Sequence, residues 1–124
     1  MIITGRLDVT LTPEAGLIPN GSAMHLAKQY HGALSGTGAG LMLAAHGTVA
    51  GSASYVAMEQ VTGILDGHMG SFMLQHSGTM EGGRESLSIT VVPHSGMGAL
   101  AGLSGSMTIT RNGAYRAYRF EYTL

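Results

Sequence analysis

The segment that decides the fold is residues 55–76, which read YVAMEQVTGILDGHMGSFMLQH. Two runs that mix apolar and polar residues in alternation flank an Asp66-Gly67 pair in this segment. Such alternation is typical of strands with one buried face, and Asp-Gly between two of them is a strong signal for a two-residue hairpin turn. Residues 57–60 taken alone would also suit a helix. The β-branched residues around them and the turn favour a hairpin, so we predict two antiparallel strands.

The position of the turn determines which residues face each other across this hairpin. With Asp66 and Gly67 as the loop, the expected pairs are Leu65 with His68, Val61 with Phe72, Glu59 with Leu74, and Ala57 with His76. One face then carries Tyr55, Glu59, Val61, Leu65, His68, Phe72, Leu74 and His76. Because this face is mostly large and apolar, we expect it to point inward. The other face carries Val56, Met58, Gln60, Thr62, Ile64, Met69, Ser71, Met73 and Gln75, and we expect it to contact a second copy of the chain.

Similar runs recur at residues 3–11, 24–34, 86–92, 99–103, 106–110 and 115–124. Glycine makes up 20 of the 124 residues, and glycine disfavours helices but suits turns and bends; we expect a bend at Gly36, Gly38 and Gly40. Many short strands without a convincing helix indicate a sandwich or a barrel. We predict an all-β fold with a single domain over residues 1–124, a small antiparallel β-barrel of about eight strands.

Composition bounds the classes of function. Charged residues are only 10% of the chain, against about 25% in an average protein, so we expect a homo-oligomer whose contacts cover part of the surface. The net charge of −1 gives no attraction for nucleic acid or for an anionic membrane. Cysteine is absent, which excludes disulfides and thiol nucleophiles. No signal peptide or long apolar run is recognisable, so we expect a cytoplasmic protein.

The predicted hairpin brings two titratable residues together. Glu59 and His76 would be diagonal neighbours on the inward face, where a carboxylate orients an imidazole and tunes it as a general acid or base. We therefore predict Glu59 and His76 as catalytic residues. The substrate-binding residues that we predict are Tyr55, His68, Phe72 and Leu74. The alternative is a buried pair that only satisfies its own hydrogen bonds.

Two other patterns indicate no specific function. The six histidines stand singly, without a His-x-His pair, and we predict neither a metal nor a cofactor. In the last strand, residues 115–124, alternation leads us to expect the aromatic side chains inside the barrel and Arg116 and Arg119 outside.

Five segments, taken in order, resemble a bacterial domain-of-unknown-function family. They are YVAMEQV (55–61), GHMGSFMLQH (67–76), VVPHSG (91–96), LAGL (100–103) and YRFEYTL (118–124). The resemblance implies a barrel similar to allene oxide cyclase, usually in an oligomer, and it implies no established activity. Relatives by fold include cofactor-free cyclases and dirigent-like proteins, which bind apolar small molecules. The chain departs from the family's usual polar residues at Ala33, Leu41, Gln60, His68, Met97 and Ala99. We interpret these changes either as drift or as a pocket recut for an apolar substrate.

Three functional hypotheses follow. The first is a cofactor-free catalyst of proton transfer, isomerisation or cyclisation, acting on a small apolar molecule in the barrel. The second is a carrier in which Tyr55 and His76 only orient the ligand. The third is a structural oligomeric barrel with a filled core. A cavity of about 300 Å³ or more would favour the first two hypotheses.

Overall fold

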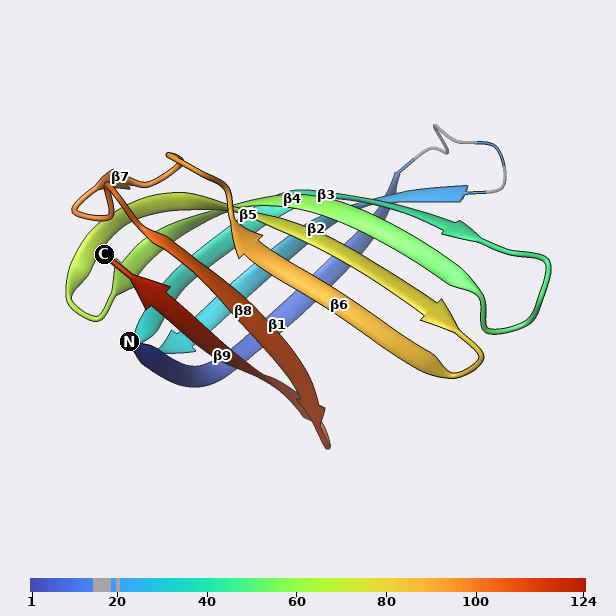
Figure 1. Ribbon diagram of the computed structural model, residues 1–124. Helices are drawn as coiled ribbons and strands as arrows, with labels where there is room; N and C mark the ends of the chain where they lie inside the picture. Colours follow the sequence, from blue (N-terminus) through green and yellow to red (C-terminus); the bar gives the residue numbers. More distant parts are fainter. Residues whose placement is uncertain (15–18, 20) are drawn as a thin grey trace.

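The computed structural model describes residues 1–14, 19 and 21–124, and these residues form an antiparallel β-barrel (Figure 1). Its strands are β1 (Ile2–Glu14), β2 (Gly21–Gly32), β3 (Leu34–His46), β4 (Ala53–Leu65), β5 (His68–Glu81), β6 (Arg84–Val91), β7 (Met97–Gly98), β8 (Ser104–Asn112) and β9 (Tyr115–Thr123). Most of them are longer than the sequence runs that predicted them. In the described part of the chain, no helix is long and apolar enough to cross a membrane.

The sheet closes on itself. The strand order is β4-β3-β2-β1-β9-β8-β6-β5, and β5 pairs with β4 again, which completes a closed barrel of eight strands. The short β7 is an extra strand that pairs with β5 at Gly70 and Ser71. The predicted all-β barrel is therefore confirmed.

The β4–β5 hairpin has the predicted register. Val61 pairs with Phe72, Glu59 with Leu74, and Ala57 with His76. Asp66 and Gly67 have φ angles of 48° and 85°. Positive φ at both loop positions is the requirement of a type I′ turn, which is the reason that Asp-Gly predicted the register correctly.

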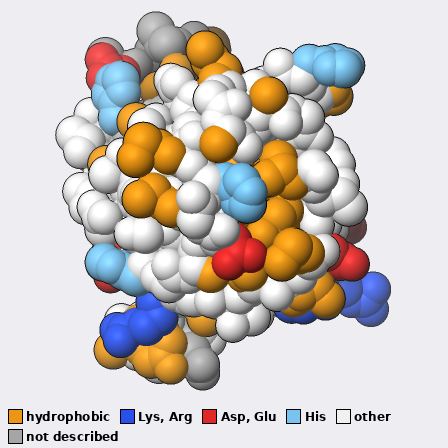
Figure 2. All heavy atoms as spheres, turned by 90° about the vertical axis from the view of Figure 1, so that its left-hand side faces the viewer, with side chains coloured by type: hydrophobic (Ala, Val, Ile, Leu, Met, Phe, Trp, Pro, Cys, Tyr) orange, Lys and Arg blue, Asp and Glu red, His pale blue; other side chains and the backbone are white. Residues whose placement is uncertain are grey.

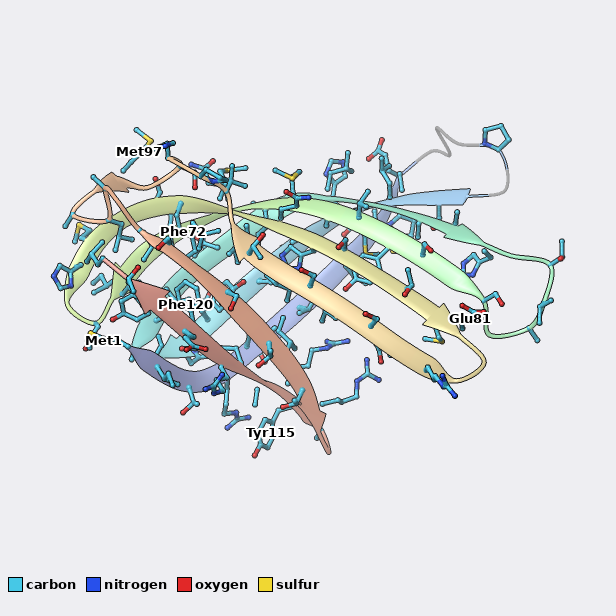
Figure 3. All side chains as sticks on the ribbon, viewed as in Figure 1. Met1, Phe72, Glu81, Met97, Tyr115 and Phe120 are labelled. Carbon is cyan, nitrogen blue, oxygen red and sulfur yellow. The ribbon has the colours of Figure 1, made fainter. Side chains whose placement is uncertain are left out.

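One end of the barrel is filled with side chains. The rings of Phe72 and Phe120 stack inside the barrel with centroids 5.8 Å apart, and Phe120 also stacks on Tyr122 (Figure 3). Leu65 and Leu100 are almost completely buried beside them. This end carries the β4–β5 turn, and its surface shows separate hydrophobic patches among other side chains and backbone, with few charged side chains (Figure 2).

Two predicted features of the chain are wrong. Residues 99–103 form successive turns and not a strand, because Gly98 and Gly102 have positive φ angles and the amide of Leu103 bonds back to the carbonyl of Leu100. This puts Leu100 and Leu103 into the core at a spacing of three. The expected bend at residues 36–40 is instead the middle of β3.

The wall of the barrel is weakest between β6 and β8. These strands pair at only two positions, Ile89 with Met107 and Thr90 with Ser106. Beyond them the two strands diverge toward the β5–β6 and β8–β9 turns (Figure 1). The barrel is therefore closed at this place by a short seam, and its wall is incomplete near the end opposite the aromatic stack.

Candidate functional site

The interior holds a network of four polar side chains with Glu59 at its centre. One carboxylate oxygen, Oε1, lies 2.9 Å from Lys28 Nζ and 2.8 Å from His76 Nε2. The other oxygen, Oε2, accepts a hydrogen bond of 2.6 Å from the Tyr30 hydroxyl. Glu59 and Tyr30 are fully buried, and Lys28 and His76 are less than 10% exposed. Buried charges need such pairing and hydrogen bonding to offset the cost of leaving water.

A glycine on β3 makes this network possible. Lys28 and Tyr30 lie on β2, and Glu59 lies on β4, so the carboxylate must reach across β3. A Cβ at Gly38 would collide with the Glu59 carboxylate and approach the Tyr30 ring. The absence of a side chain at Gly38 therefore leaves the space through which Glu59 reaches β2.

The network keeps Glu59 ionised. Burial by itself raises the pKa of a carboxyl group, but the His76 hydrogen bond, the Lys28 charge and the Tyr30 hydrogen bond together hold the pKa of Glu59 below its usual value. Burial and the charge of Glu59 raise the pKa of Tyr30 far above its usual value, so Tyr30 stays a neutral phenol that donates its proton.

An ionised carboxylate also determines the state of the His76 ring. A carboxylate only accepts hydrogen bonds, so Nε2 of His76 must carry a proton and donate it to Glu59. In the neutral ring the lone pair is then on Nδ1. Every fully buried side-chain nitrogen and oxygen of the described residues has a hydrogen-bond partner, yet no bond to Nδ1 is present; Nδ1 is therefore not completely enclosed, although His76 as a whole is only 4% exposed.

A pocket of about 530 Å³ opens beside this network. It lies in the end of the barrel opposite the aromatic stack and next to the seam. Lys28 and His76 are part of its wall, while Glu59 and Tyr30 lie behind them. The apolar part of the wall comes from Val9, Leu11, Leu26, Met42, Ala57, Met80, Leu87, Ile89 and Ile109. Its size is within the range of sites that bind small molecules, and it exceeds the volume at which the sequence hypotheses of binding are favoured.

Two of the predicted site residues, Tyr55 and His76, line this pocket, and a third, Glu59, lies behind its wall. Glu59 and His76 are in direct contact, as the hairpin register predicted, and His76 and Tyr55 line the pocket. Tyr55 is half-buried, and a Cβ at Gly78 on the neighbouring strand would collide with its ring. Burial and the nearby Glu85 charge raise the pKa of Tyr55 above its usual value, so its hydroxyl stays protonated at neutral pH.

The other three predicted binding residues do not line the pocket. Phe72 and Leu74 point inward but are packed in the filled core. His68 is exposed, because it directly follows the turn at the rim, and its Nδ1 lies 3.2 Å from the carbonyl oxygen of Asp66. The prediction that His68 points into the barrel is wrong.

The sequence reading missed Lys28 and Tyr30, although a signal was available. Residues 26, 28 and 30 have the same parity on one strand, and the outer two are a leucine and a tyrosine. The single lysine of the chain therefore lies on an apolar face. That pattern indicates a buried cation with a partner.

Arg116 is also placed differently from the prediction. It has the same parity as Tyr118 and Phe120, so it lies on the inward side of β9 and lines the pocket, while Arg119 is on the outside. The six departures from the family pattern, at residues 33, 41, 60, 68, 97 and 99, are all exposed, and none of them lines the pocket. The interpretation that they recut this pocket for an apolar substrate is therefore wrong.

Within the described ranges, no group of three or more histidine and carboxylate side chains comes together in a geometry that could hold a metal ion. The carboxylate at the centre of the network is shared between a lysine, a tyrosine and a single histidine.

Comparison with known proteins identifies the family. The sequence matches the family described as "Protein of unknown function (DUF3224)" over residues 3–122. The chain belongs to the DUF3224 family. The chain is similar to the crystal structure of a DUF3224 protein of unknown function from Shewanella oneidensis MR-1 at 1.84 Å resolution. The two are 44% identical, with a TM-score of 0.96 over 99% of this chain and 96% of that one. A search of curated proteins gives no match.

Membership of the DUF3224 family confirms the resemblance seen in the sequence, and the family brings no established activity with it. The likeness to allene oxide cyclase stays a prediction. The function of this DUF3224 barrel must therefore be argued from its pocket.

Proposed function

We propose that this DUF3224 protein binds a small, largely apolar carbonyl compound in the pocket and catalyses a proton transfer on it without a cofactor. The observation that carries the proposal is the His76 ring, which is held by a buried carboxylate through Nε2 while Nδ1 has no bond within the protein and the residue lines the pocket. A base needs both features, a defined tautomer and access to the substrate.

The side chains at the pocket are sufficient for each step of the proposed reaction. Nδ1 of His76 takes a proton from a carbon next to the carbonyl group, and the electron pair of that C–H bond moves into the carbonyl to form an enolate. Lys28 donates one hydrogen bond to Glu59 and has two further N–H groups, which can stabilise the enolate oxygen. The imidazolium then returns its proton to the same carbon or, in a conjugated substrate, to another carbon, which gives an isomer.

In this scheme Glu59 is a positioning residue. Its two oxygens already accept bonds from Lys28, His76 and Tyr30, so it has little remaining capacity to take a proton from a substrate. Its role is to set the His76 tautomer and to stabilise the imidazolium that forms. This differs from the sequence hypothesis, in which Glu59 and His76 shared the acid–base role.

A carrier is the second candidate function. It is favoured by the completeness of the network, since all buried side-chain nitrogen and oxygen atoms of the described residues have hydrogen-bond partners within the protein. In a carrier, Tyr55, Lys28 and His76 would only orient the carbonyl group of the ligand.

One experiment separates the candidates. The protein is incubated with 2-octanone in D₂O, and hydrogen–deuterium exchange next to the carbonyl is followed by NMR, while binding is measured from chemical shifts of pocket amides. The variants are His76→Gln and Lys28→Met, and His68→Gln is the matched control because it changes an exposed histidine. Catalysis predicts exchange well above buffer in the wild type and the control. It predicts exchange near background in His76→Gln, with binding retained.

The other possible results also distinguish the candidate functions. Binding without exchange above buffer in the wild type would support the carrier and refute the catalyst. Equal exchange in all variants would refute the role of His76. If 2-octanone shifts no pocket amide, the proposal of an apolar carbonyl ligand is wrong and the structural hypothesis gains support.

A further inference from the structure

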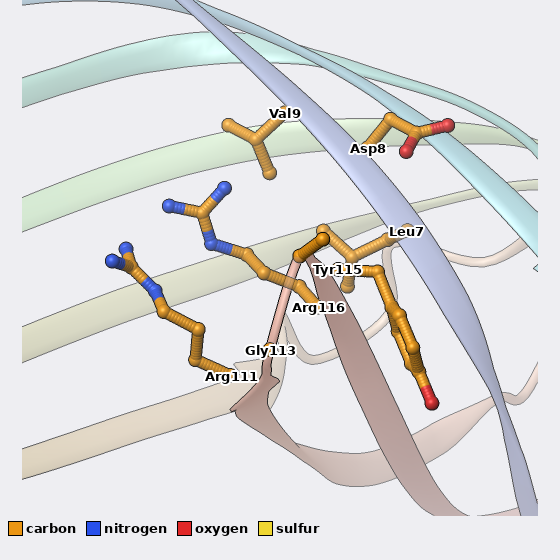
Figure 4. A pocket seen from close by; sticks show the side chains of 8 residues that line it. Leu7, Asp8, Val9, Arg111, Gly113, Tyr115 and Arg116 are labelled. Carbon is orange, nitrogen blue, oxygen red and sulfur yellow. The ribbon is translucent and has the colours of Figure 1, made fainter.

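Two arginines lie directly opposite each other at the mouth of the pocket. Arg111 on β8 pairs with Arg116 on β9 in the strand register. Arg111 has the parity of Met107 and Ile109, which point inward. Both arginines line the apolar pocket and also an adjoining hollow of about 350 Å³. In Figure 4 the two guanidinium groups extend toward the same side, and that of Arg116 ends near Val9.

This arrangement is electrostatically unfavourable by itself. Like charges directly opposite each other on neighbouring strands repel and destabilise the pair. The ion pairs of the described residues include one arginine, Arg119 with Glu121, and neither Arg111 nor Arg116 forms one. An anion placed between the two guanidinium groups would convert the repulsion into attraction.

The other charges around the mouth do not supply that anion. Glu85 on β6 lines the pocket but lies outside ion-pair distance of both arginines. Asp8 lines the adjoining hollow, and its carboxylate lies 3.0 Å from His31 Nε2. At the floor, Lys28 is paired with Glu59. The two arginines therefore outnumber the one carboxylate of the pocket mouth.

We propose that Arg111 and Arg116 bind a carboxylate group of the ligand, whose apolar part fills the pocket toward Lys28 and His76. This inference rests on the proposed function and deepens it: the substrate class is an apolar oxo acid, with its carbonyl at the floor and its carboxylate at the mouth. Guanidinium groups suit this role because each can bind a carboxylate through two parallel hydrogen bonds.

The test compares two probes of equal chain length, octanoate and octan-1-ol, by calorimetry and by chemical shifts of pocket amides. The proteins are the wild type, the double variant Arg111→Gln/Arg116→Gln and the matched control Arg119→Gln. Arg119 is suitable because it is on the same strand but on the outer face. We expect the wild type and the control to bind octanoate at least tenfold more tightly than octan-1-ol. We expect the double variant to lose this preference while it keeps its affinity for octan-1-ol.

The measurements distinguish an error about the carboxylate site from an error about the pocket itself. If the wild type binds both probes equally, or if Arg119→Gln loses the preference as fully as the double variant, the carboxylate site is refuted while the apolar pocket stands. If neither probe shifts a pocket amide, both proposals are wrong. The double variant removes a repulsion, so its thermal midpoint should not fall, and a fall of several degrees would contradict the unpaired state of the arginines.

Discussion

The buried network makes a quantitative prediction for Glu59→Gln. The substitution keeps the size of the side chain and removes its charge, so that the Lys28 ammonium remains in the interior without its carboxylate. Three charge-assisted hydrogen bonds, of 2.6, 2.8 and 2.9 Å, are weakened at once. Breaking a buried ion pair by removal of one partner costs about 3–5 kcal/mol. A protein of this size has a free energy of unfolding of about 5–15 kcal/mol, so the loss is a large fraction of the total.

Urea unfolding at pH 7, followed by circular dichroism, measures this loss. With a slope of about 2 kcal/mol per molar urea, a loss of about 4 kcal/mol moves the midpoint down by about 2 M. The companion variant Glu59→Gln/Lys28→Met leaves no unpaired charge in the interior. The cost in Glu59→Gln comes from the isolated ammonium, which the double variant no longer has. The loss of unfolding free energy in the double variant should therefore be at least about 2 kcal/mol smaller than the sum of the losses in the two single variants.

The pH dependence gives a second, independent measure. The folded pKa of Glu59 is lowered below its usual value of 4.5, so its contribution is fully present above pH 4.5 and is lost as the pH falls through the folded pKa. The difference in stability between the wild type and Glu59→Gln should therefore shrink in acid. Additive single losses at pH 7, or a difference that grows below pH 4.5, would refute this account of the network.

Three further predictions concern other parts of the barrel. Gly38→Ala should cost about 2–3 kcal/mol in urea unfolding, because the new Cβ occupies the space of the central carboxylate, whereas Gly47→Ala outside the strands should cost much less. Phe72→Leu should lower stability by about 1–2 kcal/mol and leave the affinity for octan-1-ol unchanged, since its ring belongs to the filled core; a lost affinity would contradict this. Light scattering should show a homo-oligomer that Ile64→Glu dissociates and Thr108→Glu does not, and a monomeric wild type would end the expectation of an assembly.

Local chemistry made part of this structure predictable. The Asp-Gly turn determined the register of β4 and β5, and the register determined that Glu59 and His76 meet. These contacts depend on residues close in sequence, and period-two alternation assigns each side chain to a face.

The rest of the network depends on which strands are neighbours. Lys28 reaches Glu59 from a strand two positions away in the barrel, and it does so only because Gly38 leaves the space between them free. The sequence was read as a bend at this glycine, since a strand interior normally avoids the residue. Arg116 is a different case: we expected it outside the barrel, although its parity with Tyr118 is that of an inward-facing residue.

The short seam between β6 and β8 has a consequence for association with other chains. A complete barrel presents no free strand edge, but here the ends of two strands keep unpaired backbone groups beyond the two paired positions. Each of these ends carries charge, Arg84 and Glu85 on one strand and Arg111 on the other. Charged side chains on an open edge disfavour the addition of a foreign strand. Two of the residues at the pocket mouth, Glu85 and Arg111, are thus also placed where charge disfavours edge-to-edge association.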